Sequence, residues 1–269
     1  MTFIYRPGDL LDDRLLRGSP SVRIPASGFY SAQLSTDSRK QWQVNVNPTA
    51  SWNTEGGWGR NANLSLTLRP STRITTTVGP TFGASRSKFQ YVRAIADTTV
   101  AAFSGRRYVV SDLTQRQVAF DTRVNLTFSP TMTLEKYAQP FVASQHYHDF
   151  KEFDAPREGA YSVYGRDRGT IAAATAEGRV TAYTIDPDGD GAANAFTIQN
   201  PDFNFRSLRG NAVFRWEYRP GSTLFVAWIQ QRSDIATIGN FDVGRDQRAL
   251  FDARPDNIFL VKASWWLAR

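Results

Sequence analysis

The 269-residue chain contains no cysteine and only two histidines and two methionines. The absence of cysteine excludes disulfides and thiolate metal sites, and it fits an exported protein that needs neither. No run of 18 apolar residues occurs, so the sequence predicts no transmembrane helix. The first twenty residues also lack the uninterrupted apolar segment of a signal peptide, so we expect any export signal to lie outside this sequence.

Charge of one sign is not concentrated anywhere, although the formal net charge is +7, from 32 Lys and Arg against 25 Asp and Glu. A nucleic-acid-binding protein gathers such an excess on one stretch or face, whereas here the basic residues are spread along the whole length. We therefore expect no nucleic-acid partner and interpret the charge as solvated loops and an Arg-lined interior.

Helical periodicity is also almost absent, and the Ala-rich segment 169–178 is too short to predict a helix on its own. Apolar and polar residues instead alternate with a period of two, which is typical of strands with one apolar and one polar face. In residues 41–53, every second side chain from Trp42 to Trp52 is apolar, and polar side chains stand between them. The same alternation occurs in residues 61–69, 117–128 and 208–219.

This periodicity predicts about eleven strands, most of them long. We expect them at 27–37, 40–53, 58–69, 72–97, 105–128, 131–147, 158–167, 178–186, 204–219, 222–233 and 256–268. Tight connections, three of them next to a proline, largely alternate with longer polar ones at 98–104, 148–157, 187–203 and 234–255. Residues 1–26 are expected to be an irregular leader or the remnant of an upstream region, and residues 27–269 to form one β domain.

A soluble β-sandwich and a membrane β-barrel share this alternation, so strand length and loop length decide between them. Globular strands run about 5–6 residues and membrane-barrel strands about 9–11, and most of the strands expected here exceed the first range. Outer-membrane barrels also sort tight turns to one side and long loops to the other. We predict an all-β fold, a transmembrane antiparallel up-and-down β-barrel. Because single-chain bacterial barrels have even strand numbers, about eleven visible strands indicate a fragment of a larger barrel.

The aromatic residues support the same prediction. Trp42 and Trp52 share a face ten residues apart, which at ~3.3 Å per residue and a tilt of about 40° spans ~25 Å along the membrane normal. Trp216, Tyr218 and Trp265 lie beside a Pro turn or near the C-terminus, where an aromatic girdle would fall. We predict that these five aromatics lie at the membrane interfaces; the alternative is ordinary core packing.

Lys136 is the exception to the pattern, because it shares a face with Leu134, Ala138 and Val142. A lysine facing lipid near mid-depth costs about 2–4 kcal/mol. Either its side chain reaches the interface, or strand 131–147 has a different register.

Three segments carry a resemblance to a known family. They are NPDFNFRSLRGNAVFRWEYRPGSTLFVAW (200–228), LTFSPTMTLEKYAQPFVAS (126–144) and FDARPDNIFLVKASWWLAR (251–269). Over nearly the whole chain from about Asp13, the sequence resembles an uncharacterised family of bacterial outer-membrane β-barrel domains. In that family the barrel often follows a domain similar to a family-nine carbohydrate-binding module.

The resemblance implies a place in the outer membrane of a Gram-negative bacterium. It implies three partners: the lipid bilayer, the barrel-assembly machinery and the N-terminal carbohydrate-binding-like domain. It also implies that this domain, the signal peptide and the first barrel strands lie outside the present sequence. The family has no established catalytic residues, so the resemblance assigns none.

Residues 185–196 contain a candidate calcium loop. Asp186, Asp188 and Asp190 stand at alternate positions followed by Gly191, which is the spacing at which carboxylates converge on Ca²⁺ around a sharp bend. The twelfth position of such a loop is normally Glu, but here it is Thr197. The alternative is an ordinary Asp- and Gly-rich loop tip.

Both histidines lie in the segment SQHYHDF at 144–150. His146 and His148 point the same way along a strand beside Asp149, so they could bind a metal or provide a base oriented by a carboxylate. The alternative is a polar strand end without chemistry. The serine-hydrolase, zinc-protease and phosphate-loop motifs are absent from the sequence.

Several charged residues are expected to point into the barrel lumen. They are Arg123, Arg209, Arg215, Glu217 and Lys262. Such a lining can select solutes or can form a salt-bridge network that fills a closed interior, and both readings stay open.

The sequence therefore predicts an outer-membrane barrel with a structural, anchoring or passive transport role, linked to carbohydrate binding or uptake. An outer-membrane hydrolase with a His and Asp site at the rim is the first alternative. A soluble β-sandwich binding module is the second.

Overall fold

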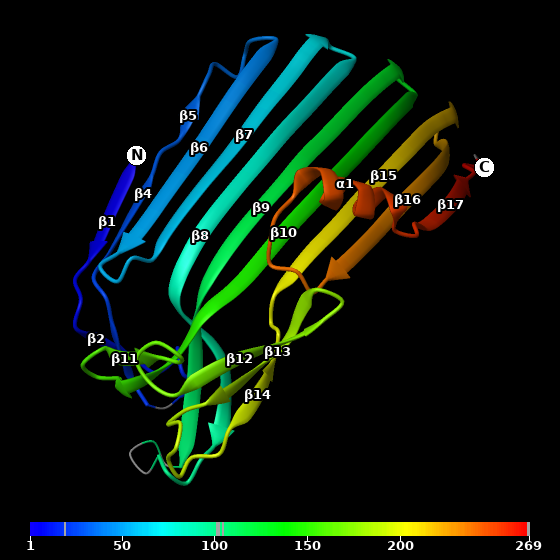
Figure 1. Ribbon diagram of the computed structural model, residues 1–269. Helices are drawn as coiled ribbons and strands as arrows, with labels where there is room; N and C mark the ends of the chain where they lie inside the picture. Colours follow the sequence, from blue (N-terminus) through cyan, green and yellow to red (C-terminus); the bar gives the residue numbers. More distant parts are fainter. Residues whose placement is uncertain (19, 101–102, 104, 268–269) are drawn as a thin grey trace.

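The computed structural model describes residues 1–18, 20–100, 103 and 105–267, and one antiparallel sheet of twelve strands dominates it (Figure 1). The strand order is β1–β4–β6–β7–β8–β9–β10–β15–β16–β17, with β5 paired to β6 and β11 to β10. The strands of this sheet are β1 (Thr2–Arg6), β4 (Ser27–Ser31), β5 (Leu34–Ser35), β6 (Trp42–Asn53), β7 (Trp58–Ser71), β8 (Ile74–Ala96), β9 (Arg106–Ser129), β10 (Met132–Ala155), β11 (Ala160–Val163), β15 (Phe203–Arg219), β16 (Ser222–Ala236) and β17 (Asp256–Ser264). The predicted all-β, antiparallel architecture is confirmed.

The sheet is open. Its edges are β1 and β17, which lie on opposite sides of Figure 1, and they do not pair with each other in the described part of the chain. The described strands thus form an open sheet and not a closed barrel.

Two small sheets and one helix complete the fold. The first sheet pairs β2 (Leu10–Asp12) with β3 (Val22–Ile24), and the second contains β12 (Thr170–Ala176), β13 (Arg179–Asp186) and β14 (Phe196–Gln199). Helix α1 (Val243–Asp252) follows β16, and the Asp242 carboxylate caps it by accepting the Arg245 backbone N–H. Among the described residues, no helix is long and apolar enough to cross a membrane.

The predicted strands differ from the observed ones in several places. Strand β10, predicted to end at residue 147, continues to Ala155 through most of the predicted connection 148–157. Residues 1–26 were expected to be irregular but contain β1, β2 and β3, and β1 extends the main sheet. The predicted strand 27–37 is interrupted, and only four residues of 158–167 form a strand. The Ala-rich segment 169–178 is mostly β12. Strand β17 ends at Ser264, and residue 268 of its predicted range lies outside the described residues.

Three turns of two residues lie at one end of the sheet, here called the Pro-turn end, at the top of Figure 1. They are Thr72–Arg73, Pro130–Thr131 and Pro220–Gly221. Pro presets the first turn position in the last two, whereas Pro70 lies inside β7, before the first turn. Gly221 has φ 76, a conformation that disfavours other residues. The opposite end, here called the long-loop end, carries the longer connections and the small sheets.

The strand register separates an apolar face from a polar face. Cross-strand pairs such as Val46 with Leu64 and Phe82 with Val118 lie on the apolar face, and pairs such as Asn45 with Ser65 lie on the polar face. Lys136 pairs with Val124 and Ala212 on the apolar face, so strand β10 is in phase and the lysine is a true exception.

The packed core lies at the long-loop end and not along the sheet. One cluster joins β9 and β10 to the second small sheet through Val109, Phe150, Tyr164, Ile185 and Ile198. The other joins the same two strands to the first small sheet through Leu16, Val22, Val110 and Phe153. Large side chains of the apolar face stay exposed, for example Trp42 at 47% and Phe82 at 49%.

Candidate functional site

A row of arginines lies at the border of the apolar face that is nearer the long-loop end. On β7, β8, β9, β15 and β16 the first charged side chain beyond the apolar segment is arginine: Arg60, Arg86, Arg116, Arg206 and Arg232. The register places Arg60 and Arg116 level with each other, since both pair with Ala84. Arg86 lies two residues closer to the long-loop end, and Arg206 and Arg232 lie two and four residues closer to the Pro-turn end. We call these five residues the arginine border.

A histidine and an aspartate meet beside this border. The Nδ1 atom of His146 on β10 lies 2.8 Å from Oδ2 of Asp202, and Oδ1 of Asp202 accepts the Tyr147 backbone N–H at 2.7 Å. Asp202 is buried, and the His146 side chain is half exposed. The Asp202 carboxylate therefore orients the imidazole and leaves its Nε2 atom free of this contact. In the neutral ring Nε2 suits a base or a metal ligand, and in the protonated ring it is a hydrogen-bond donor.

Asp202 was not among the predicted site residues. His146 and His148 do point the same way, with ring centroids 5.4 Å apart, but Asp149 lies beside His148 at 3.2 Å and not beside His146. Asp149 has φ 51 and sits where the β10 ladder shifts register. The pairing of His146 with a residue 56 positions away depends on the chain returning along β15.

The His146 side chain lines a cavity of about 520 Å³ on the apolar-face side of the sheet. Thr114, Arg116 and Ser144 line its strand side, the β12–β13 hairpin contributes Arg179 and Tyr183, and the segment 237–241 closes another side. Gly239 packs so tightly there that a Cβ would lie 2.6 Å from Asp202 Oδ2 and 2.7 Å from His146 Nδ1. The cavity combines two guanidinium groups, an imidazole and hydroxyl groups, which together suit an anion.

His148, Asp112 and Asp149 approach closely enough to hold a metal ion. Asp112 is fully buried, however, and its carboxylate already bonds Arg86 at 2.6 Å, Lys88 at 2.8 Å and the buried Lys151. Three cations around one carboxylate leave little negative charge for a cation to neutralise. The residues therefore fit a metal poorly.

Burial alone would raise the pKa of Asp112, but the hydrogen bonds from Lys151, Lys88 and Arg86 outweigh it and hold the pKa below its ordinary value. Burial lowers the pKa of Lys151 despite this pairing. Nearby, Glu152 bonds Arg107 and the Tyr164 hydroxyl, and burial together with the Glu152 charge raises the pKa of Tyr164. These networks fix the long-loop ends of β9 and β10 and stay away from the cavity.

Two aspartates of the predicted calcium loop accept hydrogen bonds from backbone N–H groups of the loop itself. Asp186 Oδ1 accepts the Gly189 N–H at 3.0 Å, and Asp188 Oδ2 accepts the Ala193 N–H at 3.0 Å. Among the described residues, Asp186, Asp188 and Asp190 do not form a cluster with metal-ligand spacing. Calcium binding by this loop stays a prediction.

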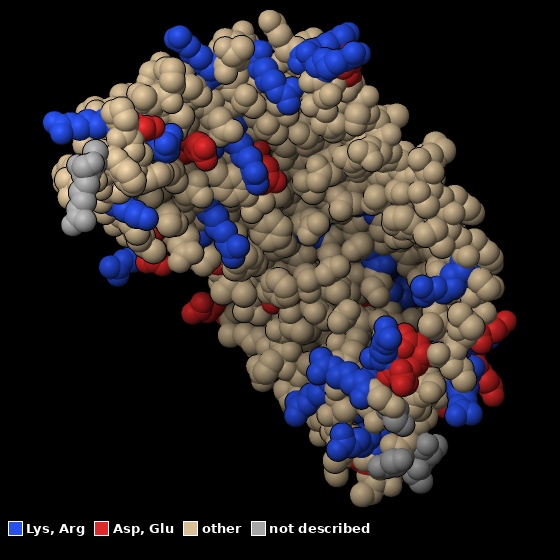
Figure 2. Space-filling model, turned by 180° about the vertical axis from the view of Figure 1, so that it is seen from behind, with Lys and Arg blue, Asp and Glu red and all other residues tan. Residues whose placement is uncertain are grey.

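The five residues expected in a lumen belong to strands β9, β15 and β17. On the polar face, Arg123 lies 5.1 Å from the Tyr137 ring centroid, and Arg215 lies 3.5 Å from Glu217. Arg209 pairs with Gln139 and Gln231, and Lys262 with Phe225. Seen from behind, the molecule carries most of its Lys and Arg side chains towards its two ends (Figure 2).

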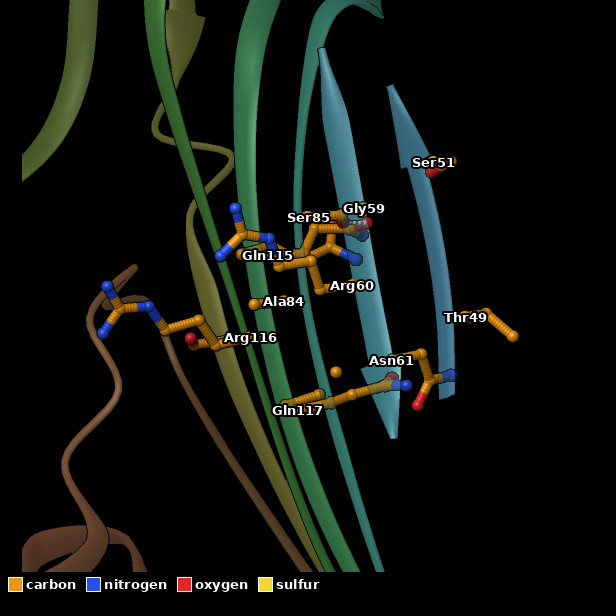
Figure 3. A pocket seen from close by; sticks show the side chains of 14 residues that line it. Thr49, Ser51, Gly59, Arg60, Asn61, Ala84, Ser85, Gln115, Arg116 and Gln117 are labelled. Atoms are coloured by element: carbon orange, nitrogen blue, oxygen red, sulfur yellow. Dashed lines mark hydrogen bonds between the residues drawn. The ribbon is translucent and has the colours of Figure 1, made fainter. Parts of the chain in front are cut away.

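The polar face is hollowed nearer the long-loop end, where a groove of about 250 Å³ is lined mainly by uncharged side chains such as Ser51, Asn61 and Gln117. In Figure 3, Asn61 and Gln117 point into this groove, whereas Arg60 and Arg116 point to the other side of the sheet. Together with the charged residues near the Pro-turn end, this groove gives the face a hydrophilic surface that could line a water-filled space.

The five predicted interface aromatics lie away from the packed core. Trp42, Trp52, Trp216 and Trp265 are all exposed, so ordinary core packing does not explain them. Tyr218 packs between Trp216 and Trp265 with ring centroids 6.0 and 6.2 Å away. Trp52 pairs with Trp58 at the other end of the sheet.

One family model matches the sequence, described as "Domain of unknown function (DUF5916)", over residues 16–268. No curated protein and no solved structure matches the chain.

Proposed function

Because the chain belongs to the DUF5916 family, which carries no assigned activity, we propose its role from its physical form: a wall of an outer-membrane β-barrel in a Gram-negative bacterium. The observation that carries this proposal is the exposed apolar face, which continues across strands β6 to β10 and β15 to β17. A soluble protein rarely exposes apolar patches beyond a few hundred Å². Lipid would cover this face.

The dimensions of the apolar face support the proposal. On β6 the apolar side chains run from Trp42 to Trp52, which at ~3.3 Å per residue and a tilt of about 40° corresponds to ~25 Å. This is about the height of the apolar band of outer-membrane barrels, and tryptophan stands at both of its ends. The three short turns at one end and longer connections at the other match the asymmetry of such barrels.

The open edges imply additional strands. Strands β1 and β17 leave backbone N–H and C=O groups unpaired on their outer sides, which is not tolerated in lipid. We propose that further strands of the same protein join β1 and β17 and close the barrel. The barrel-assembly machinery and a carbohydrate-binding-like domain are proposed partners on the strength of the family resemblance.

The proposed mechanism is passive. The polar face would line the lumen, and its uncharged hydroxyl and amide groups would hydrogen-bond water or sugar hydroxyls. The protein would then anchor an attached module or let hydrophilic solutes pass, without chemistry on this chain.

A matched pair of substitutions tests the proposal. Val46 on the apolar face and Asn47 on the polar face are neighbours near the middle of β6. Because the apolar face is proposed to meet lipid, Val46→Arg should destabilise the protein by about 2–4 kcal/mol, whereas Asn47→Arg should have little effect. The measurement is urea unfolding in lipid vesicles. Equal effects, or a wild-type chain that stays monomeric in buffer without detergent, would contradict the barrel and favour the soluble binding module.

The His146–Asp202 pair supports a second candidate, an outer-membrane hydrolase. An imidazole held by a buried carboxylate at the wall of a cavity is suited to act as a general base. Under this proposal His146→Ala abolishes ester hydrolysis by the purified protein, and His148→Ala retains it because His148 has a different carboxylate partner. A wild-type protein without hydrolytic activity towards ester substrates would leave the passive role standing.

A further inference from the structure

We propose that the 520 Å³ cavity beside His146 binds the phosphate group of a membrane-lipid headgroup. The inference rests on the proposed membrane location, because it uses the position of the cavity at the end of the apolar face. Its ligands would be Arg116 from β9 and Arg179 from the β12–β13 hairpin, with His146 as an additional donor through Nε2 when the ring is protonated at both nitrogens.

Three arginines of the arginine border have protein partners, whereas Arg60 lies 5.6 Å from the Trp58 ring centroid and, like the cavity arginines, has no carboxylate at ion-pair distance among the described residues. Arg86 bonds Asp112, Arg206 bonds Asp234 and Asp246, and Arg232 donates to the Phe251 carbonyl. For Arg116 and Arg179, the described residues provide neither a hydrogen-bond acceptor nor a carboxylate within ion-pair distance. Arg116 and Arg179 are exposed, and two guanidinium groups without a protein partner on one cavity suit an anion; phosphate is the anion whose geometry a guanidinium fork matches best.

The one carboxylate in the cavity wall does not oppose this. Both oxygens of Asp202 are already engaged, one by the His146 imidazole and the other by the Tyr147 N–H. His146 therefore presents its Nε2 side to the cavity, where Thr114 and Ser144 add hydroxyl groups. Asp202 keeps its single negative charge, but both its oxygens are engaged by these contacts, and the two guanidinium groups leave the cavity lining with an excess of positive charge.

The position favours a lipid as the source of the phosphate. Arg116 is separated from Val118 by one residue, so the cavity begins where the apolar face ends. A lipid whose acyl chains lie along Phe120 and Val118 would carry its headgroup phosphate at the level of Arg116. Tyr183 and Phe241 provide the apolar wall on the opposite side.

The test uses the full chain in dodecyl maltoside micelles with phosphatidic acid, phosphatidylcholine or inorganic phosphate as the probe. Arg116→Gln combined with Arg179→Gln should weaken phosphatidic acid binding by about tenfold or more, since charge-assisted bonds to phosphate are lost. Arg123→Gln, which removes a guanidinium from the polar face, is the matched control and should leave binding unchanged. Native mass spectrometry of the protein–lipid complex provides the measurement.

Several outcomes would overturn the inference. Equal binding of phosphatidic acid and phosphatidylcholine, or an equal loss in the Arg123→Gln variant, would show that the cavity does not select the phosphate. Full displacement of the lipid by millimolar inorganic phosphate would identify a free anion as the ligand instead.

The same preparations separate this inference from the proposed function. If the double variant still requires detergent for solubility but binds phosphatidic acid like the wild type, only the lipid site fails. If the wild-type chain is soluble without detergent, the membrane proposal fails and the lipid site fails with it.

Discussion

At the scale of single residues, the buried carboxylate of Asp112 has the largest expected effect on stability. It forms ion pairs with three cations, so Asp112→Asn should destabilise the long-loop end by about 3–5 kcal/mol at pH 7. The pKa of Asp112 is lowered in the folded protein, so its contribution is complete above the ordinary value of 3.8 and is lost as the pH falls through the lowered value. The difference between variant and wild type should therefore shrink below about pH 4.

Limited proteolysis of the long-loop end in urea, at pH 7 and at pH 3, measures this difference. The control is Asp37→Asn, because Asp37 pairs only with Arg39 on the surface and its loss should change stability little. A destabilisation by Asp112→Asn that is the same at both pH values would contradict the assignment of the effect to charge.

Gly239 provides a second prediction at this scale. Its missing Cβ would collide with Asp202 and His146, so Gly239→Ala should separate that pair and cost about 1–3 kcal/mol. Only two histidines are present, so NMR of ¹⁵N-labelled histidine can follow His146 directly.

Gly244→Ala is the control for this change, because the nearest atom to its added Cβ would be Asp242 Oδ1 at 3.7 Å, an ordinary contact. The Gly239 account is wrong if both variants leave the His146 signal in place.

The sequence was informative about half of the candidate site. The alternation of β10 was enough to predict that His146 and His148 share a direction, because strand periodicity is local. It could not predict Asp202 or Arg179, because these residues reach the cavity through the β12–β13 hairpin and the start of β15, whose placement depends on tertiary packing. The isolated acidic residue before Phe203 gives no signal in the sequence.

At the scale of elements, strand β10 carries one residue in conflict with its surroundings. Lys136 lies opposite Val124 and Ala212 on the apolar face, four residues into the strand from the Pro-turn end. Lys136→Leu should stabilise the protein in lipid by about 1–2 kcal/mol, less than the mid-depth value because the lysine can reach the interface.

Urea unfolding in vesicles measures the gain, and Glu135→Leu on the polar face is the neighbouring control, which should bring none. If Lys136→Leu lowers stability in lipid, the apolar face does not meet hydrocarbon at this depth.

The turn between β15 and β16 gives a further prediction at this scale. Gly221 has φ 76, and a Cβ there would lie 3.0 Å from the Cβ of Trp266. Gly221→Ala should destabilise the hairpin by about 1–2 kcal/mol, through the strain of the left-handed conformation. The thermal midpoint in detergent provides the measurement, and Ser71→Ala at the β7–β8 turn, whose φ is not positive, should change it less.

Most elements that extend over ten residues were predictable, although β10 continues eight residues beyond its predicted end, and of the shorter strands β13 was predicted to within one residue. Strands β6 to β9, β15 and β16 begin and end within a few residues of the predicted positions, because their long alternation outweighs local propensity. Helix α1 is amphipathic at helical spacing, but it was missed because it has only ten residues and is polar on average. The strands before residue 27 were missed because β1 is exposed and pairs with β4 through its backbone.

At the scale of the whole molecule, the open sheet predicts uneven protection of backbone amides. Strand β17 is paired on one side only, so about half of its N–H groups lack a strand partner, whereas β9 and β10 lie between neighbours on both sides. Hydrogen–deuterium exchange of this chain in detergent should be fast in β17 and slow in the middle of β9.

Co-expression with the remaining strands of the protein should slow exchange in β17 and leave exchange in β9 unchanged. Closing the barrel would give the open edge of β17 a strand partner. Slow exchange of β17 in the isolated chain would instead point to pairing between two copies of the sheet.

The location of the packed core has a consequence for how this protein can change over time. In the described part of the chain, the buried apolar clusters lie where β9 and β10 meet the small sheets, while the apolar face of the main sheet needs only to remain apolar. Val, Leu, Phe and Ala should therefore replace one another freely along that face, whereas Val109, Phe150 and Ile185 should tolerate few replacements. The sequences of divergent relatives should then differ most on the apolar face of the main sheet, which is the part of the chain that reflects its surroundings most clearly. They should be easier to align at the long-loop end.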